Sequence, residues 1–361
     1  MRAARQRKLK RPWLLWLNLG LALASAACLL ALLLLAGRLD TQKEAERWKG
    51  ESELEFRQLS CFLPIDEKLG LSDVFAFRYA ILDKIHEASL DVDNDGTLFV
   101  DAWSTSGKAA VSTHLGKGDA RITAVGGAFF QFHPLRLISG SYIAEGDLMQ
   151  DRVLLDEELA WLLYGGANLS GMEVRINGKP FQVVGVIERE QDFASRRAYT
   201  DGMGLYMSYD AYKELEEDAG ISCYEVVMPN PVRNFAINFA REKFPIGNGV
   251  IVENTNRFRF GKLLDVMTQF GKRTMQNRGI LYPYWENAAR CIEDWCTLLM
   301  LLSILLAVTP AVSLVRLIQR TLKRGKEKLA DDLLPEWKDS VEESIRVRQR
   351  RRWEKRHATQ K

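Results

Sequence analysis

The stretch Trp13–Gly37, WLLWLNLGLALASAACLLALLLLAG, decides the class of this protein because it runs for 25 residues without a charge. About 20 such residues are enough to cross a bilayer as a helix. A second uncharged run, Cys296–Val315, lies near the other end of the chain. A fully buried core helix is the alternative, but both runs are rich in leucine and alanine and have basic residues beside them. We therefore predict two transmembrane helices.

The basic residues are concentrated at the two ends of the chain. Residues 1–12 carry six basic and no acidic residues, and residues 316–361 carry 15 basic against 8 acidic residues. The formal net charge is only +3, so these ends leave −10 for residues 13–315. This acidic middle argues against nucleic acid as a partner. By the positive-inside rule, both termini are expected in the cytoplasm, and the segment between the helices outside it.

These observations predict an order of five parts for a protein of the cell membrane. They are a basic cytoplasmic N-terminus (1–12), transmembrane helix 1 (13–37), an extracytoplasmic domain (38–295), transmembrane helix 2 (296–315) and a charged cytoplasmic tail (316–361). A cleaved signal peptide is the alternative for the first hydrophobic run, but the run is longer than the hydrophobic core of such peptides. Pro310 removes one hydrogen bond from the second helix and is expected to bend it.

The domain between the two hydrophobic runs shows an α+β pattern. Asn177-Gly178 separates two alternating segments in MEVRINGKPFQVVGVIE (172–188), which predicts a β-hairpin with a type I′ turn. Asp156 is expected to cap a short helix that Gly165-Gly166 ends. A helical stalk is predicted over residues 40–60, and a sheet covered by helices on one face is predicted for the domain. The other segments are helices at 72–87, 209–219, 233–244 and 257–276 and strands at 98–103, 121–125, 152–155, 205–207, 224–228 and 250–252.

Three motifs in this domain carry a family resemblance. Gly140-Ser141-Tyr142 is followed by Asp147, then by DRVLLDEELAWLLYG (151–165), and then by GMEVRINGKPFQVVGVIE (171–188). Their order over residues 121–190 resembles the MacB-like periplasmic core domain of bacterial ABC transporter permeases of the MacB/FtsX type. That family also places this domain between its first two membrane spans. Its permeases usually have three spans after the domain, where this sequence has one.

The resemblance implies a non-catalytic permease-like subunit of an ABC transport or mechanotransmission complex. Its partners would be a separate ABC-type ATPase, a second copy of the chain or a full-length permease, and the lipid bilayer. A membrane-anchored scaffold or ligand sensor without transport activity is the alternative, because one fold serves many functions.

The residues themselves indicate no catalytic, cofactor-binding or metal site. The sequence has no G-x-x-x-x-G-K-[ST] phosphate loop and no G-x-S-x-G elbow, and its four histidines form no i, i+4 pair. Asp91, Asp93 and Asp95 match the start of an EF-hand loop, but Ala102 stands where the loop needs a glutamate. An ordinary acidic turn is the preferred interpretation. No cofactor and no enzymatic activity are therefore expected.

Three further features allow two interpretations each. Cys61 and Cys223 are compatible with a disulfide or with two buried thiols. Aromatic residues at 129, 130, 132, 199, 206, 209 and 212 suit core packing better than a ligand groove. The tail, with its basic run Arg350–Arg352, suits contact with anionic lipid headgroups, and docking to a cytoplasmic protein is the alternative.

Overall fold

The fold is taken from a computed structural model. It describes residues 12–67, 69–90, 98–144, 146–147, 149–199, 202–270, 273, 276–277, 279–328 and 334–358. The chain divides into two compact units. One unit is Leu32–Leu298, and the other combines Met1–Ala31 with Leu299–Lys361.

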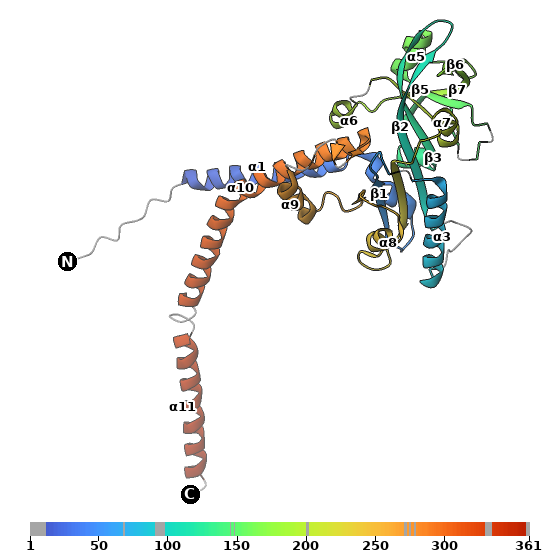
Figure 1. The fold of residues 1–361 in the computed structure, drawn as a ribbon. Coiled ribbons are helices and arrows are strands. Elements are labelled where there is room, and N and C mark those ends of the chain that lie inside the picture. The colour runs from blue at the N-terminus through green and yellow to red at the C-terminus, as the bar shows by residue number, and fades with distance from the viewer. Residues whose placement is uncertain are drawn as a thin grey trace. The chain divides into compact units, whose positions relative to one another are not determined.

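The unit Leu32–Leu298 is built on one mixed sheet (Figure 1). Among the described residues the strand order is β10-β1-β9-β2-β3-β8-β5-β7-β4, and β6 pairs with both β2 and β7. Neighbouring strands are antiparallel except for β3 with β8 and β5 with β7. The strands are β1 Phe56–Phe62, β2 Val100–Ser112, β3 Lys117–Gly127, β4 Arg136–Gly140, β5 Arg152–Asp156, β6 Glu173–Ile176, β7 Lys179–Glu188, β8 Gly204–Ser208, β9 Cys223–Pro229 and β10 Val250–Glu253. A separate two-stranded ladder joins β11 Gln276–Asn277 to β12 Ile280–Leu281.

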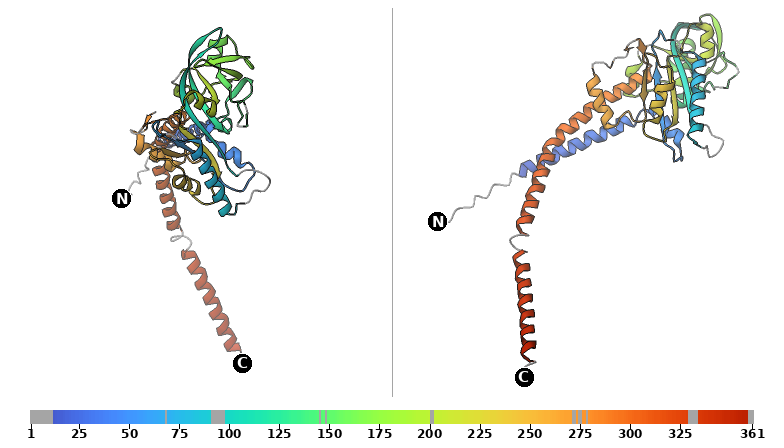
Figure 2. Two further views of the ribbon diagram at one scale, coloured as in Figure 1. Left: turned by 45° about the vertical axis from the view of Figure 1, so that its right-hand side comes forward. Right: turned by 60° about the horizontal axis from the view of Figure 1, so that its bottom comes forward.

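One face of the sheet carries the main hydrophobic core. It is covered by α3 Leu71–Glu87, α5 Glu157–Tyr164, α7 Tyr209–Leu215 and α8 Phe235–Lys243, whose buried side chains pack with alternate strand residues such as Leu59 and Cys61. Helices also lie over the opposite face, so the expectation of a sheet covered on one face only was wrong (Figure 2). The short helices there are η1 Asp40–Gln42, α2 Glu44–Lys49 and α4 Phe129–Phe132. The unit also contains α6 Phe193–Ala198 and α9 Phe260–Gln269.

Local sequence rules place several elements correctly. Asn177 and Gly178 both have positive φ, 47° and 83°, as a type I′ turn requires between β6 and β7. The carboxylate of Asp156 accepts a hydrogen bond from the Leu159 N–H at 2.7 Å and so caps α5. Gly165 ends that helix in the left-handed conformation.

The predicted stalk helix over residues 40–60 was wrong in its second half. Residues 56–60 belong to β1, which lies between β9 and β10 and pairs with both. The helical segments near residues 209 and 257 are also shorter than expected, since α7 ends at Leu215 and α9 covers only Phe260–Gln269. The irregular spacing of hydrophobic residues in this segment does not fix its structure, and pairing with distant strands makes it β1.

The glycines of the family motifs make a close backbone contact. Gly140 and Gly185 are partners in the β4–β7 ladder, and the Ser141 N–H bonds to the Val184 carbonyl at 3.1 Å. A Cβ atom on Gly140 would lie 1.9 Å from the Val184 oxygen, and Gly140 also has a φ of 79°. Two of the segments that suggested the family therefore meet because only glycine fits between them.

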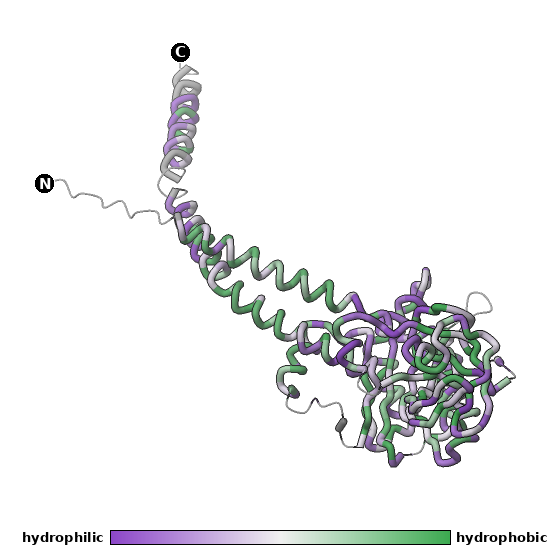
Figure 3. Tube along the Cα trace, turned by 90° about the horizontal axis from the view of Figure 1, so that it is seen from above, coloured by the Kyte–Doolittle hydropathy of each residue, from purple (hydrophilic) through white to green (hydrophobic). Residues whose placement is uncertain are grey.

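The second unit consists of long helices. It contains Pro12–Ala31 of α1 (Pro12–Ala36), Leu299–Lys328 of α10 (Tyr284–Lys328), and α11 Leu334–Ala358. Within the described residues, two helices are long and hydrophobic enough to cross a membrane, and both are mainly hydrophobic over that stretch (Figure 3). The Ser25 hydroxyl lies 2.9 Å from that of Ser303 and joins them. Pro310 lies within α10, where membrane helices tolerate it.

Candidate functional site

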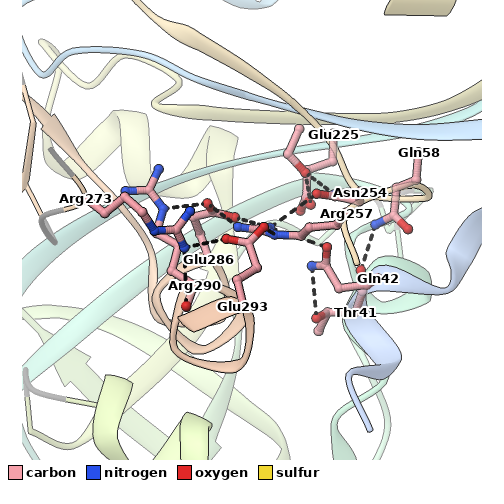
Figure 4. Close-up of polar contacts among 11 residues, drawn as sticks. Thr41, Gln42, Gln58, Glu225, Asn254, Arg257, Arg273, Glu286, Arg290 and Glu293 are labelled. Carbon is pink, nitrogen blue, oxygen red and sulfur yellow. Dashed lines mark hydrogen bonds and ion pairs between the residues drawn. The ribbon is translucent and has the colours of Figure 1, made fainter. Parts of the chain in front are cut away.

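The site is a cluster of buried and partly buried charged side chains on the polar face of the sheet, here called the ion network. Its members are Arg257, Arg273, Glu286, Arg290 and Glu293 (Figure 4). Arg257 follows β10, and three of the others lie on the first turns of α10, the helix that continues into the second hydrophobic run. All five belong to the unit Leu32–Leu298. The network therefore joins the base of the domain to the start of a membrane helix.

Arg257 lies at the centre of the ion network and is 4% exposed. Its Nη1 and Nη2 atoms donate to the two carboxylate oxygens of Glu286 at 2.7 and 2.8 Å. Its Nε donates to Glu293 at 2.5 Å. A paired, charge-assisted geometry of this kind is the strong form of an arginine–carboxylate contact. Glu286 and Glu293 are seven residues apart, so they lie on the same side of α10, where one guanidinium contacts both.

Two further arginines bond to the same two glutamates. Arg290 donates to Glu286 at 2.7 Å, and Arg273 donates to Glu293. Burial by itself would raise the pKa of Glu286, but Arg257 and Arg290 outweigh burial and hold that pKa below its usual value of 4.5. Burial would lower the pKa of Arg257, and the two glutamates raise it instead. Both partners are therefore charged at neutral pH.

A second set of contacts ties the segment that follows α1 to the same face of the sheet. The Gln58 side chain on β1 donates to the Thr41 carbonyl at 2.7 Å and accepts from the Glu44 N–H at 3.1 Å. Gln42 lies 3.5 Å from Arg257 Nη1. These contacts place both segments that lead to the membrane helices against one part of the sheet.

Polar residues on β1 and β9 continue this arrangement into the sheet. Ser60 donates to Glu225 at 2.8 Å and accepts from Asn254 at 2.7 Å. Glu225 also bonds to the buried ring of His133. Alternation along β1 explains the pattern, because Gln58 and Ser60 face these groups while Leu59 faces the hydrophobic core.

The ion network stabilises the structure of the domain. Every carboxylate in it is held by arginine, and an arginine does not give up its proton in a protein. Among the described residues, no group of three histidine, cysteine or carboxylate side chains is placed to hold a metal ion. What the network does is fix the relative positions of three segments, because separating buried charges from their partners costs several kcal/mol.

The residues considered as possible sites from the sequence lie in separate parts of the fold. His133 is fully buried against Glu225, whereas His86 and His114 are exposed. Asp91, Asp93 and Asp95 lie outside the described residues. Cys61 and Cys223 are buried free thiols on neighbouring strands. Of the seven aromatic residues considered for a groove, five are buried, namely Phe129, Phe132, Tyr206, Tyr209 and Tyr212.

Sequence reasoning missed the ion network itself. None of the motifs described from the sequence contains Arg257, Glu286 or Glu293. The available signal was two glutamates seven residues apart on a helix that leads into a hydrophobic run. This pattern predicts a shared face, but it does not identify the cation that fills it.

The comparisons agree with the domain as described. The family model for the MacB-like periplasmic core domain matches residues 19–238, more than half of the chain. This protein belongs to the MacB-like periplasmic core domain family, of the MacB/FtsX type of ABC transporter permease. It is accordingly a membrane protein with an extracytoplasmic domain.

Solved structures with a similar domain share little sequence with it. The periplasmic region of MacB from Actinobacillus actinomycetemcomitans is 18% identical with a TM-score of 0.41, and the match covers 60% of this chain and 93% of that one. The extracellular domain of the noncanonic ABC-type transporter YknZ from Gram-positive bacteria is 16% identical with a TM-score of 0.35, covering 52% and 92%. No curated protein matched the chain.

Proposed function

We propose that the protein is a non-catalytic permease-like subunit of an ABC transport or mechanotransmission complex. A separate ABC-type ATPase on the cytoplasmic side would drive it, and the extracytoplasmic domain would move with its membrane helices. The observation that carries this proposal is the ion network, which joins the start of α10 to the sheet of a domain from a permease family.

The coupling follows from the cost of separating buried charges. If the start of α10 moved without the sheet, Glu286 and Glu293 would leave Arg257 in a buried setting, at a cost of several kcal/mol. The hydrogen bonds of Gln58 to the Thr41 carbonyl and the Glu44 N–H also hold the segment after α1, though each is uncharged and contributes only about 1 kcal/mol. A displacement of either helix end would therefore be passed to the sheet rather than absorbed locally.

The proposed topology puts the driving side in the cytoplasm. Six basic residues precede the first hydrophobic run, and basic residues dominate the segment after the second one. With both termini cytoplasmic, residues 38–295 lie outside, and residues 316–361 are available to an ATPase or to anionic lipid. Two spans also imply association with a second copy or with a larger permease.

Affinity purification of the tagged full-length protein in mild detergent, followed by mass spectrometry, tests this function. A version truncated after Leu322 removes the tail, and a matched version truncated after Glu343 keeps the basic residues next to the membrane. We expect an ABC-type ATPase or a larger permease with the full-length protein. Its loss with the first truncation alone would assign docking to residues 323–343.

A different set of co-purifying proteins would contradict this proposal. If only envelope proteins co-purify with all three versions, and no ATPase is found, the permease-subunit proposal fails. The protein would then be a membrane-anchored scaffold or ligand sensor that uses the same domain.

A further inference from the structure

Helix α9 (Phe260–Gln269, FGKLLDVMTQ) has a hydrophobic face that the domain covers only in part. Leu263 and Val266 are buried in the domain. Phe260, Leu264 and Met267 are 59%, 37% and 41% exposed. Phe270, directly after the helix, is 61% exposed. Large hydrophobic residues in contact with water are unremarkable singly, but these four come from one short segment.

The arrangement around the helix axis separates two surfaces. With about 100° between successive residues, the hydrophobic side chains occupy one continuous arc of about 160°. Leu263 and Val266 take one half of this arc, and Phe260, Leu264 and Met267 take the other half. Lys262, Asp265, Thr268 and Gln269 fill the polar side and are exposed. The hydrophobic arc is therefore wider than the part that the domain buries, and a membrane surface could accept the remainder.

Exposed hydrophobic residues at the ends of both hydrophobic runs belong to the same unit as this face of α9. The same unit, Leu32–Leu298, carries the ends of both hydrophobic runs, where Leu33, Leu34 and Leu298 are exposed. Trp295 is exposed as well and packs edge-on against Phe193 of α6 at 6.0 Å between ring centroids. Aromatic side chains of this kind mark the interface between hydrocarbon and water. Figure 1 shows α9 beside the part of α10 near the domain.

We propose that α9 lies in the headgroup region of the bilayer leaflet that faces the domain, with Phe260, Leu264 and Met267 inserted among the lipids. This contact is separate from the coupling function proposed above and does not depend on an ATPase. It would hold the base of the domain at a fixed height on the membrane, next to the ion network. Lipid is the occupant favoured here because the unit is already tethered to a bilayer by the exposed hydrophobic ends of two helices.

The test measures which solvent surrounds α9 in the full-length protein in phosphatidylcholine nanodiscs. A small environment-sensitive fluorophore is attached at L264C or M267C on the hydrophobic side, and at K262C or T268C as matched controls on the polar side of the same helix. Wild-type protein treated in the same way gives the background from the native cysteines. Iodide reports contact with water, and doxyl-labelled lipid reports contact with the bilayer.

We expect iodide quenching at the L264C and M267C labels to be at least about threefold weaker than at the control labels, with doxyl quenching stronger. Equal quenching by iodide on both sides overturns the proposal, because the face is then in water. Protection from iodide without doxyl quenching also overturns it, because a protein surface then covers α9. The unfolding temperature of each variant is compared with that of wild type, and F260C replaces any variant that lowers it.

Discussion

Replacing Arg257 by methionine tests whether the ion network holds the domain together. The substitution keeps much of the side-chain volume and removes three charge-assisted hydrogen bonds to Glu286 and Glu293. Both carboxylates stay buried, each with one remaining arginine, Arg290 or Arg273. Breaking a buried ion pair by removing one partner costs about 3–5 kcal/mol. We therefore expect R257M to lower the free energy of unfolding by about that amount.

The assay is thermal unfolding of the full-length protein in detergent, followed by circular dichroism and by a domain-specific fluorescence probe. For a domain of this size the expected loss corresponds to a fall of roughly 10 °C in the midpoint. Arg136→Met is the matched control, because Arg136 is 71% exposed and pairs with Glu188 at the surface of the same domain. Exposed pairs contribute at most about 1 kcal/mol, so the control is expected to shift the midpoint by only a few degrees.

One result would refute this reasoning. If R257M and R136M have the same midpoint as wild type, the buried contacts of Arg257 make no net contribution, and the proposed coupling through it has no energetic basis. Arg257→Lys adds a graded comparison, because lysine keeps the charge but cannot bond to both oxygens of Glu286 in the same way. Its midpoint is expected between those of R257M and wild type.

Three further predictions concern single positions. Glu286→Gln is expected to destabilise the protein by about 3 kcal/mol at pH 7. Because the folded-state pKa of Glu286 lies below 4.5, its charge stabilises the fold above about pH 4.5. The difference between wild type and E286Q should therefore shrink as the pH falls below that value, and a constant difference in urea titrations would contradict the assignment. Gly140→Ala should cost about 3 kcal/mol because its Cβ would clash with the Val184 carbonyl. Gly178→Ala also has a positive φ but has no atom within 4 Å of the new Cβ, so it should cost only about 1 kcal/mol; equal effects of the two alanines in thermal unfolding would show that crowding at Gly140 is unimportant.

The membrane helices and several domain elements follow from local sequence. Uninterrupted hydrophobic runs place α1 and the membrane part of α10, because a helix is the only single segment that satisfies its backbone within the bilayer. The β6–β7 hairpin follows from Asn177-Gly178, and the start and end of α5 follow from Asp156 and Gly165. Each of these rests on interactions between residues close together in the chain.

The predictions that the structure corrects concern segments that pair with residues far away in the sequence. The segment after residue 55 has no clear period of its own, and β1 forms because β9 and β10 supply hydrogen-bonding partners on both sides. Helices lie over both faces of the sheet because the start of α10 and the segment after α1 return to its polar face. The spacing of hydrophobic residues within these two segments does not predict that they pack on the polar face of the sheet.

The sequence by itself determined two long hydrophobic runs with basic residues beside them and the turns and caps of an α+β domain, because hydrophobic length, charge and turn residues are local properties. Its glycine-containing motifs also carried the resemblance to the MacB-like domain. The tertiary structure alone decided where the charged residues act. Gln42 and Arg257 are 215 positions apart, and Arg257 and Glu286 are 29 apart, yet they are neighbours on one face of the sheet. A buried charge requires a partner, and only the folded chain shows which distant residue supplies it.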